Sequence, residues 1–290
     1  MLLGFFLGGK LPKVVPVYLG QFLFWIGVPI SIVAFLRRTD LSGPLWIASL
    51  VAWVAVLLGV GLAWAWINIP KATWSQPAQG SFLLAAMVGN TGYLGYPVTL
   101  AFVGSQYFGW ALFYDLLGTT LAAWILGVAL AARFGRGAQS YWQLATAILI
   151  NPTLWSFGFG LVFRQLPLPT PASLLLHRFA WTVVALSLML IGMRLSQLNS
   201  WQSLPRASIS LGIKMLLVPL ILGSSLSLFG VTGPPQLVIV LQMAMPPAFA
   251  TLVIAEAYNL DRELSVTALA VGSLGLLVTL PIWLWLFGGS

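Results

Sequence analysis

The stretch VGNTGYLGYP (residues 88–97) lies inside a long apolar segment and decides how that segment can fold. It contains a polar Asn-Thr pair and several residues that oppose a regular helix, namely Gly89, Gly92, Gly95 and Pro97. Glycine lowers helix propensity, and proline lacks an amide hydrogen and crowds the preceding turn. The stretch therefore predicts a helix that is interrupted near Asn90.

A second stretch, QMAMPPAFATLV (residues 242–253), predicts another interruption near the end of the chain. Its adjacent prolines, Pro246 and Pro247, cannot continue a regular helix, because each restricts the residue before it to extended geometry. Met245 directly precedes them.

The composition identifies an integral membrane protein. Of 290 residues, 60% are hydrophobic and only 6% are charged. This hydrophobic content is more than a soluble domain of this size can bury in its core. The apolar runs show no two-residue alternation, so a transmembrane barrel is not expected. The net charge of +8 comes from Lys and Arg scattered at the ends of apolar runs, which does not indicate nucleic-acid binding.

Unbroken apolar runs predict nine full membrane spans and one fragment. The fragment covers residues 1–9, and the spans cover residues 14–36, 44–69, 78–104, 108–132, 141–163, 171–193, 207–229, 235–255 and 264–287. Nine helical residues reach only about 13 Å, so the first helix is short or truncated.

The chain divides into halves, residues 1–136 and 137–290, that resemble each other. The fourth and ninth spans, which lie five spans apart, carry the two interruptions. Because five crossings are an odd number, the second half enters the bilayer from the opposite side, which predicts an all-α fold of two inverted repeats.

The basic residues predict the orientation of the chain. If the start of the chain is non-cytoplasmic, eight basic residues face the cytoplasm, namely Lys10, Lys13, Lys71, Arg133, Arg136, Arg194, Arg206 and Arg262. Only Arg37, Arg38 and Arg164 then lie outside. This asymmetry favours that orientation, with a bacterial plasma membrane as the expected location.

Paired breaks in the membrane predict a binding site. A free backbone N–H or C=O is costly in lipid, so helices are interrupted where protein or a watery cavity supplies partners. If the breaks cross, half-helix N-termini converge near the bilayer centre and favour an anion. The alternative for any single proline is a simple kink, as expected for Pro29, Pro152 and Pro219.

These stretches resemble the auxin efflux carrier family of membrane transporters. GNTGYLGYP is similar to the family's fourth-helix motif, and residues 244–284 are similar to its C-terminal signature. LINPTLW (residues 149–155) and LIGMRL (residues 190–195) add weaker similarity. Gly89-Asn90 stands where the plant carriers of this family have Pro-Asn.

The resemblance implies ten helices in two inverted repeats of five, with crossing discontinuous helices four and nine. It implies a scaffold of about residues 1–36 and 141–193, and a core or transport domain of about residues 44–132 and 207–287, which slides against the scaffold. The substrate, an organic anion, is expected beside the crossover. This places substrate contacts at Gly89, Asn90, Thr91, Tyr93, Met245, Pro246 and Pro247.

Several polar residues have two open interpretations. Asn90 either donates to a carboxylate or caps the freed half-helix, and Thr91 is expected to bind local backbone. Tyr93 either contacts a ligand or packs.

Charged residues in apolar runs are candidates for ion coupling. Asp115 is expected to pair with Arg178, with a proton-carrying role as the second choice. Glu256 either binds a coupling ion or ends its helix at the cytoplasmic face. Lys214 is expected to extend to the cytoplasmic interface.

The sequence predicts secondary active transport, in the export direction, of a small organic anion such as a carboxylate. No cofactor and no metal site are expected, and the coupling ion is a proton or sodium. The alternatives are a passive channel or non-transport membrane subunit, and, less favoured, an intramembrane enzyme; the only histidine, His177, has no visible catalytic partners. The expected partners are the substrate and the lipid bilayer, and a homodimer stays open.

Overall fold

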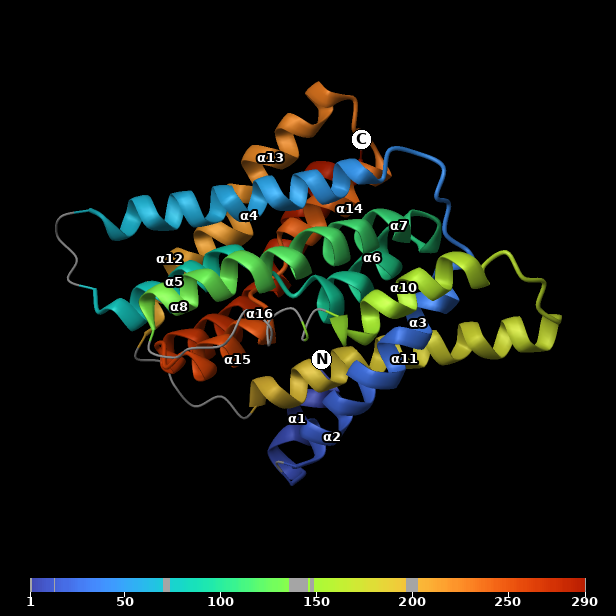
Figure 1. Cartoon of the computed structure of the whole chain (residues 1–290), viewed down its shortest axis with the longest axis horizontal. Coiled ribbons are helices and arrows are strands. Elements are labelled where there is room, and N and C mark those ends of the chain that lie inside the picture. Colours follow the sequence, from blue (N-terminus) through green and yellow to red (C-terminus); the bar gives the residue numbers. More distant parts are fainter. Residues whose placement is uncertain are drawn as a thin grey trace.

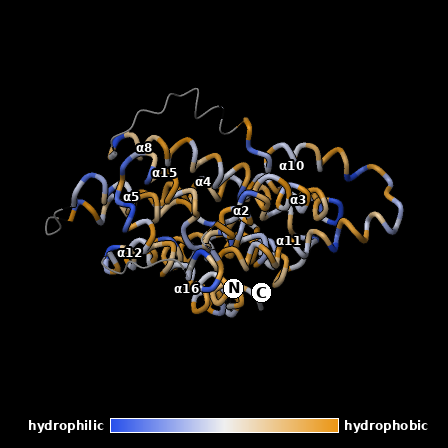
Figure 2. The backbone as a smooth tube through the Cα atoms, turned by 90° about the horizontal axis from the view of Figure 1, so that it is seen from below, coloured by the Kyte–Doolittle hydropathy of each residue, from blue (hydrophilic) through white to orange (hydrophobic). Residues whose placement is uncertain are grey.

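The computed structural model describes residues 2–12, 14–69, 74–135, 146, 149–196 and 203–289, and these residues form an all-helical protein. Six helical segments are long and apolar enough to cross a membrane: Val14–Leu36, Trp46–Ile67, Ser105–Phe134, Thr170–Arg194, Leu204–Phe229 and Arg262–Phe287. The chain is therefore a polytopic membrane protein. Figure 2 shows apolar residues along the lengths of these helices and hydrophilic stretches at several of the turns.

One group of helices packs together at the lower right of Figure 1. Here α11 contacts α1, α2 and α3, and α3 contacts α10. The group consists of α1 (Leu2–Lys10), α2 (Val14–Phe22), η1 (Leu23–Gly27), α3 (Val28–Leu36), α10 (Pro152–Phe163) and α11 (Thr170–Ser196).

The second group surrounds α5, which contacts α4, α8, α12 and α16. Its elements from the first half are α4 (Trp46–Ile67), α5 (Gln76–Met87), η2 (Thr91–Gly95), α6 (Tyr96–Phe102), η3 (Ser105–Tyr107), α7 (Phe108–Tyr114), η4 (Asp115–Thr120), η5 (Ala123–Gly127) and α8 (Val128–Phe134). Those from the second half are α12 (Leu204–Leu211), η6 (Gly212–Leu217), α13 (Val218–Leu226), η7 (Ser227–Phe229), α14 (Pro234–Met243), α15 (Phe249–Ala257) and α16 (Arg262–Phe287). The two groups meet where α11 contacts α6 and η2.

Three membrane prolines follow π-helical turns. Pro29 is the second residue of α3 after η1, Pro97 the second of α6 after η2, and Pro219 the second of α13 after η6. A proline cannot donate to the carbonyl four residues earlier, and its ring collides with that carbonyl. A wider π turn before the proline moves the carbonyl away, so these spans bend without ending.

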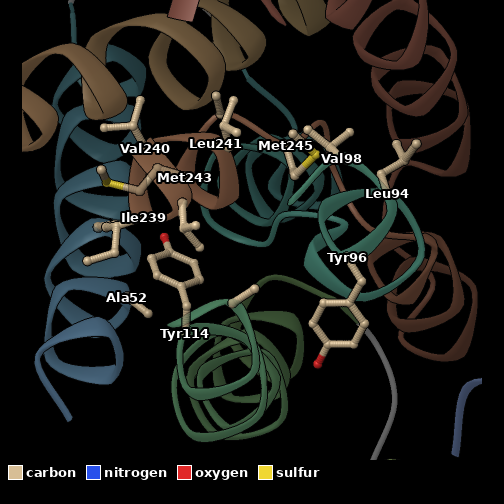
Figure 3. Packing of buried hydrophobic residues seen from close by; sticks show 14 of the residues in the cluster. Ala52, Leu94, Tyr96, Val98, Tyr114, Ile239, Val240, Leu241, Met243 and Met245 are labelled. Carbon is tan, nitrogen blue, oxygen red and sulfur yellow. The ribbon is translucent and has the colours of Figure 1, made fainter. Parts of the chain in front are cut away.

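The core of the second group is closely packed. Figure 3 shows Tyr114 pointing from α7 toward Ile239 and Met243 of α14, with Ala52 of α4 nearby. Gly59 of α4 lies against the backbone of Ala86 in α5, where a side chain would overlap with the Ala86 carbonyl oxygen. Small residues at such contacts let membrane helices approach closely.

The arginines predicted to lie on the non-cytoplasmic side, Arg37, Arg38 and Arg164, gather at one end of the molecule. Arg37 donates to the carbonyl oxygens of Phe163 and Leu166, and Arg164 donates to that of Thr39. Arg38 contacts the ring of His177 over 3.2 Å. Of the residues predicted to face the cytoplasm, Lys13, Lys71 and Arg136 lie outside the described residues.

The other predicted spans are shorter or interrupted. The span predicted at residues 78–104 is divided between α5 and α6, and that at residues 235–255 between α14 and α15. The span predicted at residues 141–163 is described only in part, with α10 beginning at Pro152.

Candidate functional site

The two interruptions contact each other through their backbones. Gly89 and Pro247 form an antiparallel β-bridge. The amide of Asn90 donates to the Pro246 carbonyl over 2.7 Å, and the amide of Ala248 donates to the Val88 carbonyl over 3.0 Å. Each break therefore supplies hydrogen-bond partners to the other, which meets the requirement for non-helical backbone inside a membrane.

Asn90 directly precedes the helical segment that begins after the first break. It is buried, and its side-chain oxygen accepts a hydrogen bond from the amide of Tyr93 over 3.3 Å. Its carbonyl accepts from the amides of Leu94 and Gly95. Asn90 therefore acts as a cap for the second half of the broken helix, which is one of the two interpretations of its sequence position.

The second break ends in a helix start without a side-chain cap. Ala248 is in an extended conformation and precedes Phe249, the first residue of α15. Because alanine has no polar side chain, amides of the first turn stay available to another acceptor. Such amides and the helix dipole favour an anion.

A cavity of about 210 Å³ lies beside the paired breaks. Six of the sequence candidates line it: Gly89, Asn90, Thr91, Gly92, Tyr93 and Asp115. Other candidates are not in its wall: Met245, Pro246, Pro247, Gly95 and Pro97. The three residues of the second break are buried behind the bridge, because Pro246 and Pro247 pack against Gly272 of α16.

Asp115 is bound by hydroxyl groups. Thr91 donates to its Oδ1 over 2.5 Å, Thr120 donates to the same oxygen over 3.2 Å, and Tyr96 donates to its Oδ2 over 2.6 Å. The residue is buried and lines the cavity. In the described part of the chain, hydroxyls and no cation contact this carboxylate. Hydrogen bonds to an ionised carboxylate are short and strong, so the three donors can stabilise it.

The predicted ion pair of Asp115 with Arg178 is wrong. Arg178 is exposed on α11, and the partners of Asp115 are hydroxyls instead. The two residues enter their spans to similar depths, but Asp115 lies buried in η4 of the second group and Arg178 lies exposed on α11 of the first. Depth along a span does not determine which face a side chain occupies.

Glu256 lies away from the cavity at the end of α15. Its carboxylate forms an ion pair with Arg262 over 2.6 Å, and both side chains are largely exposed. Among the described residues, no group of three His, Cys, Asp or Glu side chains could hold a metal ion.

Lys214 does not extend to the cytoplasmic interface, contrary to the sequence expectation. It is buried, and its Nζ donates to the carbonyl of Met243, the last residue of α14, over 3.0 Å. A Cβ atom on Gly89 would lie 3.2 Å from its Cε. The ammonium group therefore lies behind the bridge, where it stabilises the negative end of a half-helix.

A buried glutamine connects the two interrupted segments further along. Gln242 of α14 donates to the hydroxyl of Thr99 in α6 over 3.0 Å. Its Oε1 has no hydrogen-bond partner among the described residues, and a side chain at Gly95 would overlap with it. Gly95 is therefore required for this contact, in addition to its effect on helix propensity.

The sequence did not identify much of the cavity wall. Its further lining residues include Phe24, Thr119, Thr120, Trp124, Asn151, Thr153, Ala248, Phe249 and Ala250. Asn151 carried a recognisable signal, because an Asn followed by Pro152 is typical of a helix start; its side chain accepts from the amide and hydroxyl of Thr153. The others carried no signal, since only the fold brings η1, η4 and α15 to one cavity.

Comparison with known proteins agrees with the resemblance found in the sequence. Residues 1–284 match the family described as "Membrane transport protein". An uncharacterized transporter of Methanothermobacter thermautotrophicus is 30% identical over 261 residues, which cover 89% of this chain and 84% of the relative. An uncharacterized transporter of Methanocaldococcus jannaschii is 28% identical over 215 residues, covering 71% and 68%. Because the match spans nearly the whole sequence, the chain belongs to the membrane transport protein family, as its resemblance to auxin efflux carriers predicted.

Proposed function

We propose that the protein is a secondary active transporter that exports a small organic anion, such as a carboxylate, through the cavity beside the paired breaks. The observation that carries this proposal is the bridge between Gly89 and Pro247, next to a cavity lined by Asn90 and by the uncapped start of α15. Half-helix N-termini at such a cavity favour a negatively charged ligand.

The proposed architecture is a pair of inverted repeats of five helices that cross at this bridge. The bridge is antiparallel, which is the relation expected between two halves of opposite orientation. The group of α1, α2, α3, α10 and α11 is proposed to be the scaffold, and the other group the transport unit. The contacts of α11 with α6 and η2 would then be the interface that changes during transport.

We further propose a proton at Asp115 as the coupling ion. The carboxylate lies in the cavity wall and both its oxygens accept from hydroxyls, which can reorient when the acid gains a proton. The hydroxyl groups around Asp115 are those of Thr91, Tyr96, Thr120 and the nearby Tyr114. Helix α4, which packs on η4, contains no titratable side chain. Among the described residues, no cation contacts Asp115 to compete with the proton.

The test is transport by purified protein in liposomes. Counterflow and uptake of acetate, benzoate, malonate, succinate and malate are measured under separate proton and sodium gradients. A transporter gives saturable uptake and counterflow, and we expect only the proton gradient to drive accumulation. Uptake without saturation or counterflow would indicate a channel, and chemical conversion of a substrate would indicate an enzyme. The start of the chain is proposed to be non-cytoplasmic, which labelling of a cysteine introduced near it can test.

A further inference from the structure

Arg194 lies close to the proposed substrate cavity, although the sequence analysis assigned it no role in binding. It is partly buried near the end of α11. Its Cζ lies 4.2 Å from the centre of the Phe249 ring, a cation–π contact between the two helix groups. Gly20 of α2 makes room for it, because a Cβ there would lie 2.7 Å from Nη2 of Arg194.

This guanidinium group has no anionic partner among the residues that the structure describes. All five acidic residues of the chain belong to its described part, and the ion pair found there joins Glu256 and Arg262. Within the same described residues, the Arg194 side chain donates no hydrogen bond, although a guanidinium offers five N–H donors. A partly buried cation in this condition has unused capacity to bind an anion.

Two residues connect Arg194 to the cavity. Phe249 contacts the guanidinium and also lines the cavity, and Tyr93, another lining residue, lies within electrostatic range of Arg194. Phe249 is also the first residue of α15, the helix that starts without a side-chain cap. The positive end of that helix and the guanidinium therefore lie on the same side of the cavity.

We propose that Arg194 is the cationic contact for the carboxylate of the transported anion, and that the Phe249 ring covers the guanidinium while the cavity is empty. This inference rests on the proposed function and names a residue for it. A carboxylate replaces the ring because a bidentate guanidinium–carboxylate pair is stronger than a cation–π contact.

The charges around the cavity limit the anion to one carboxylate. Lys214, the other cation near the breaks, lies behind Gly89 and is bonded to the Met243 carbonyl. Asp115, which also lines the cavity, would repel a second carboxylate there. Arg194 therefore selects a monocarboxylate over a dicarboxylate.

The experiment measures binding of radiolabelled benzoate and its neutral analogue benzamide to the full-length protein in detergent. These probes have nearly the same shape and differ in charge. The variants are Arg194→Gln and Arg194→Lys, and the matched control is Arg178→Gln on the same helix, where the arginine is exposed. We expect the wild type and the control to bind benzoate at least about tenfold more tightly than benzamide, and Arg194→Gln to bind both equally.

A second variant, Phe249→Leu, removes the competing ring and keeps the guanidinium. We expect it to bind benzoate several-fold more tightly and benzamide as the wild type does. If Arg194→Gln does not fold, the benzoate affinities of Arg194→Lys and Phe249→Leu test the inference in its place. Unchanged benzoate affinity in both would overturn the inference, and so would a normal preference for benzoate in a folded Arg194→Gln protein.

Liposome transport separates this inference from the proposed function. Normal carboxylate counterflow by Arg194→Gln would reject the role of Arg194 and leave the transporter proposal intact. Counterflow of malonate or succinate by a wild type that does not bind benzoate would reject the limit to one carboxylate. If the wild type moves no carboxylate, the proposed function itself is wrong. Arg194-dependent binding of a short-chain phosphatidylglycerol with no effect of benzoate would assign the residue to a lipid headgroup and overturn the inference.

Discussion

The amide nitrogen of Asn90 donates a hydrogen bond to the carbonyl oxygen of Pro246 over 2.7 Å, although the two residues belong to opposite halves of the chain. With the Ala248 to Val88 bond, it joins two interruptions that would each be costly alone in a membrane. The shape of one break therefore depends on the other. Substitutions at either side are expected to affect the same cavity.

Asn90→Ala is expected to reduce transport about tenfold while the protein stays folded. The backbone bond to Pro246 survives, but the side-chain cap on the Tyr93 amide is lost, at a cost of about 1 kcal/mol. Liposome uptake and the thermal midpoint are the measurements. Asn68→Ala is the matched control, because Asn68 is exposed at the end of α4 and bonds only to its own helix. Normal uptake by Asn90→Ala would remove Asn90 from the substrate site.

Pro247→Ala is expected to reduce transport because alanine permits the start of α15 to extend toward the bridge. The extended backbone at this position pairs with Gly89, and proline enforces it. Uptake is compared with that of Pro281→Ala, which changes an exposed proline inside α16. If both variants transport at the wild-type rate, the break at Pro247 has no role in transport.

Gly95→Ala is expected to destabilise the protein by about 1–3 kcal/mol. The added methyl group overlaps with the buried side chain of Gln242, which is held by Thr99. Gly61→Ala is the control, since nothing lies within 4 Å of a Cβ at that position. The double variant Gly95→Ala with Gln242→Ala should recover much of the loss. A thermal midpoint unchanged by Gly95→Ala would contradict this packing.

Asp115→Asn is expected to abolish accumulation driven by a proton gradient and to leave counterflow measurable. The amide has no titratable proton, but its oxygen can still accept from Thr91 or Thr120. The control is Asp40→Asn, which neutralises an exposed carboxylate in the loop before α4. Accumulation that persists in Asp115→Asn would assign coupling to another group. Arg178→Gln should leave accumulation unchanged, since the ion pair does not form.

The sequence identified the membrane-protein class and both interruptions because these depend on local chemistry. Apolar runs are long enough to predict spans, and the glycines and prolines at residues 88–97 and 246–247 act on their own turns. Its error at Asp115 has a different origin. Whether Asp115 contacts Arg178 or the three hydroxyls depends on which helix faces pack together. The sequence does not show this packing, because every apolar span offers similar faces.

The sequence by itself determined that helices cross a membrane, where two of them break and that a polar Asn90 lies in one break. Only the tertiary structure decided that the breaks bond to each other, that Lys214 lies behind them and that Arg194 lies beside Phe249. The physical reason is the separation along the chain of the residues that interact. Helix formation and interruption depend on neighbouring residues, whereas the partners of a buried amide or charge are set by the packing of segments distant in the chain.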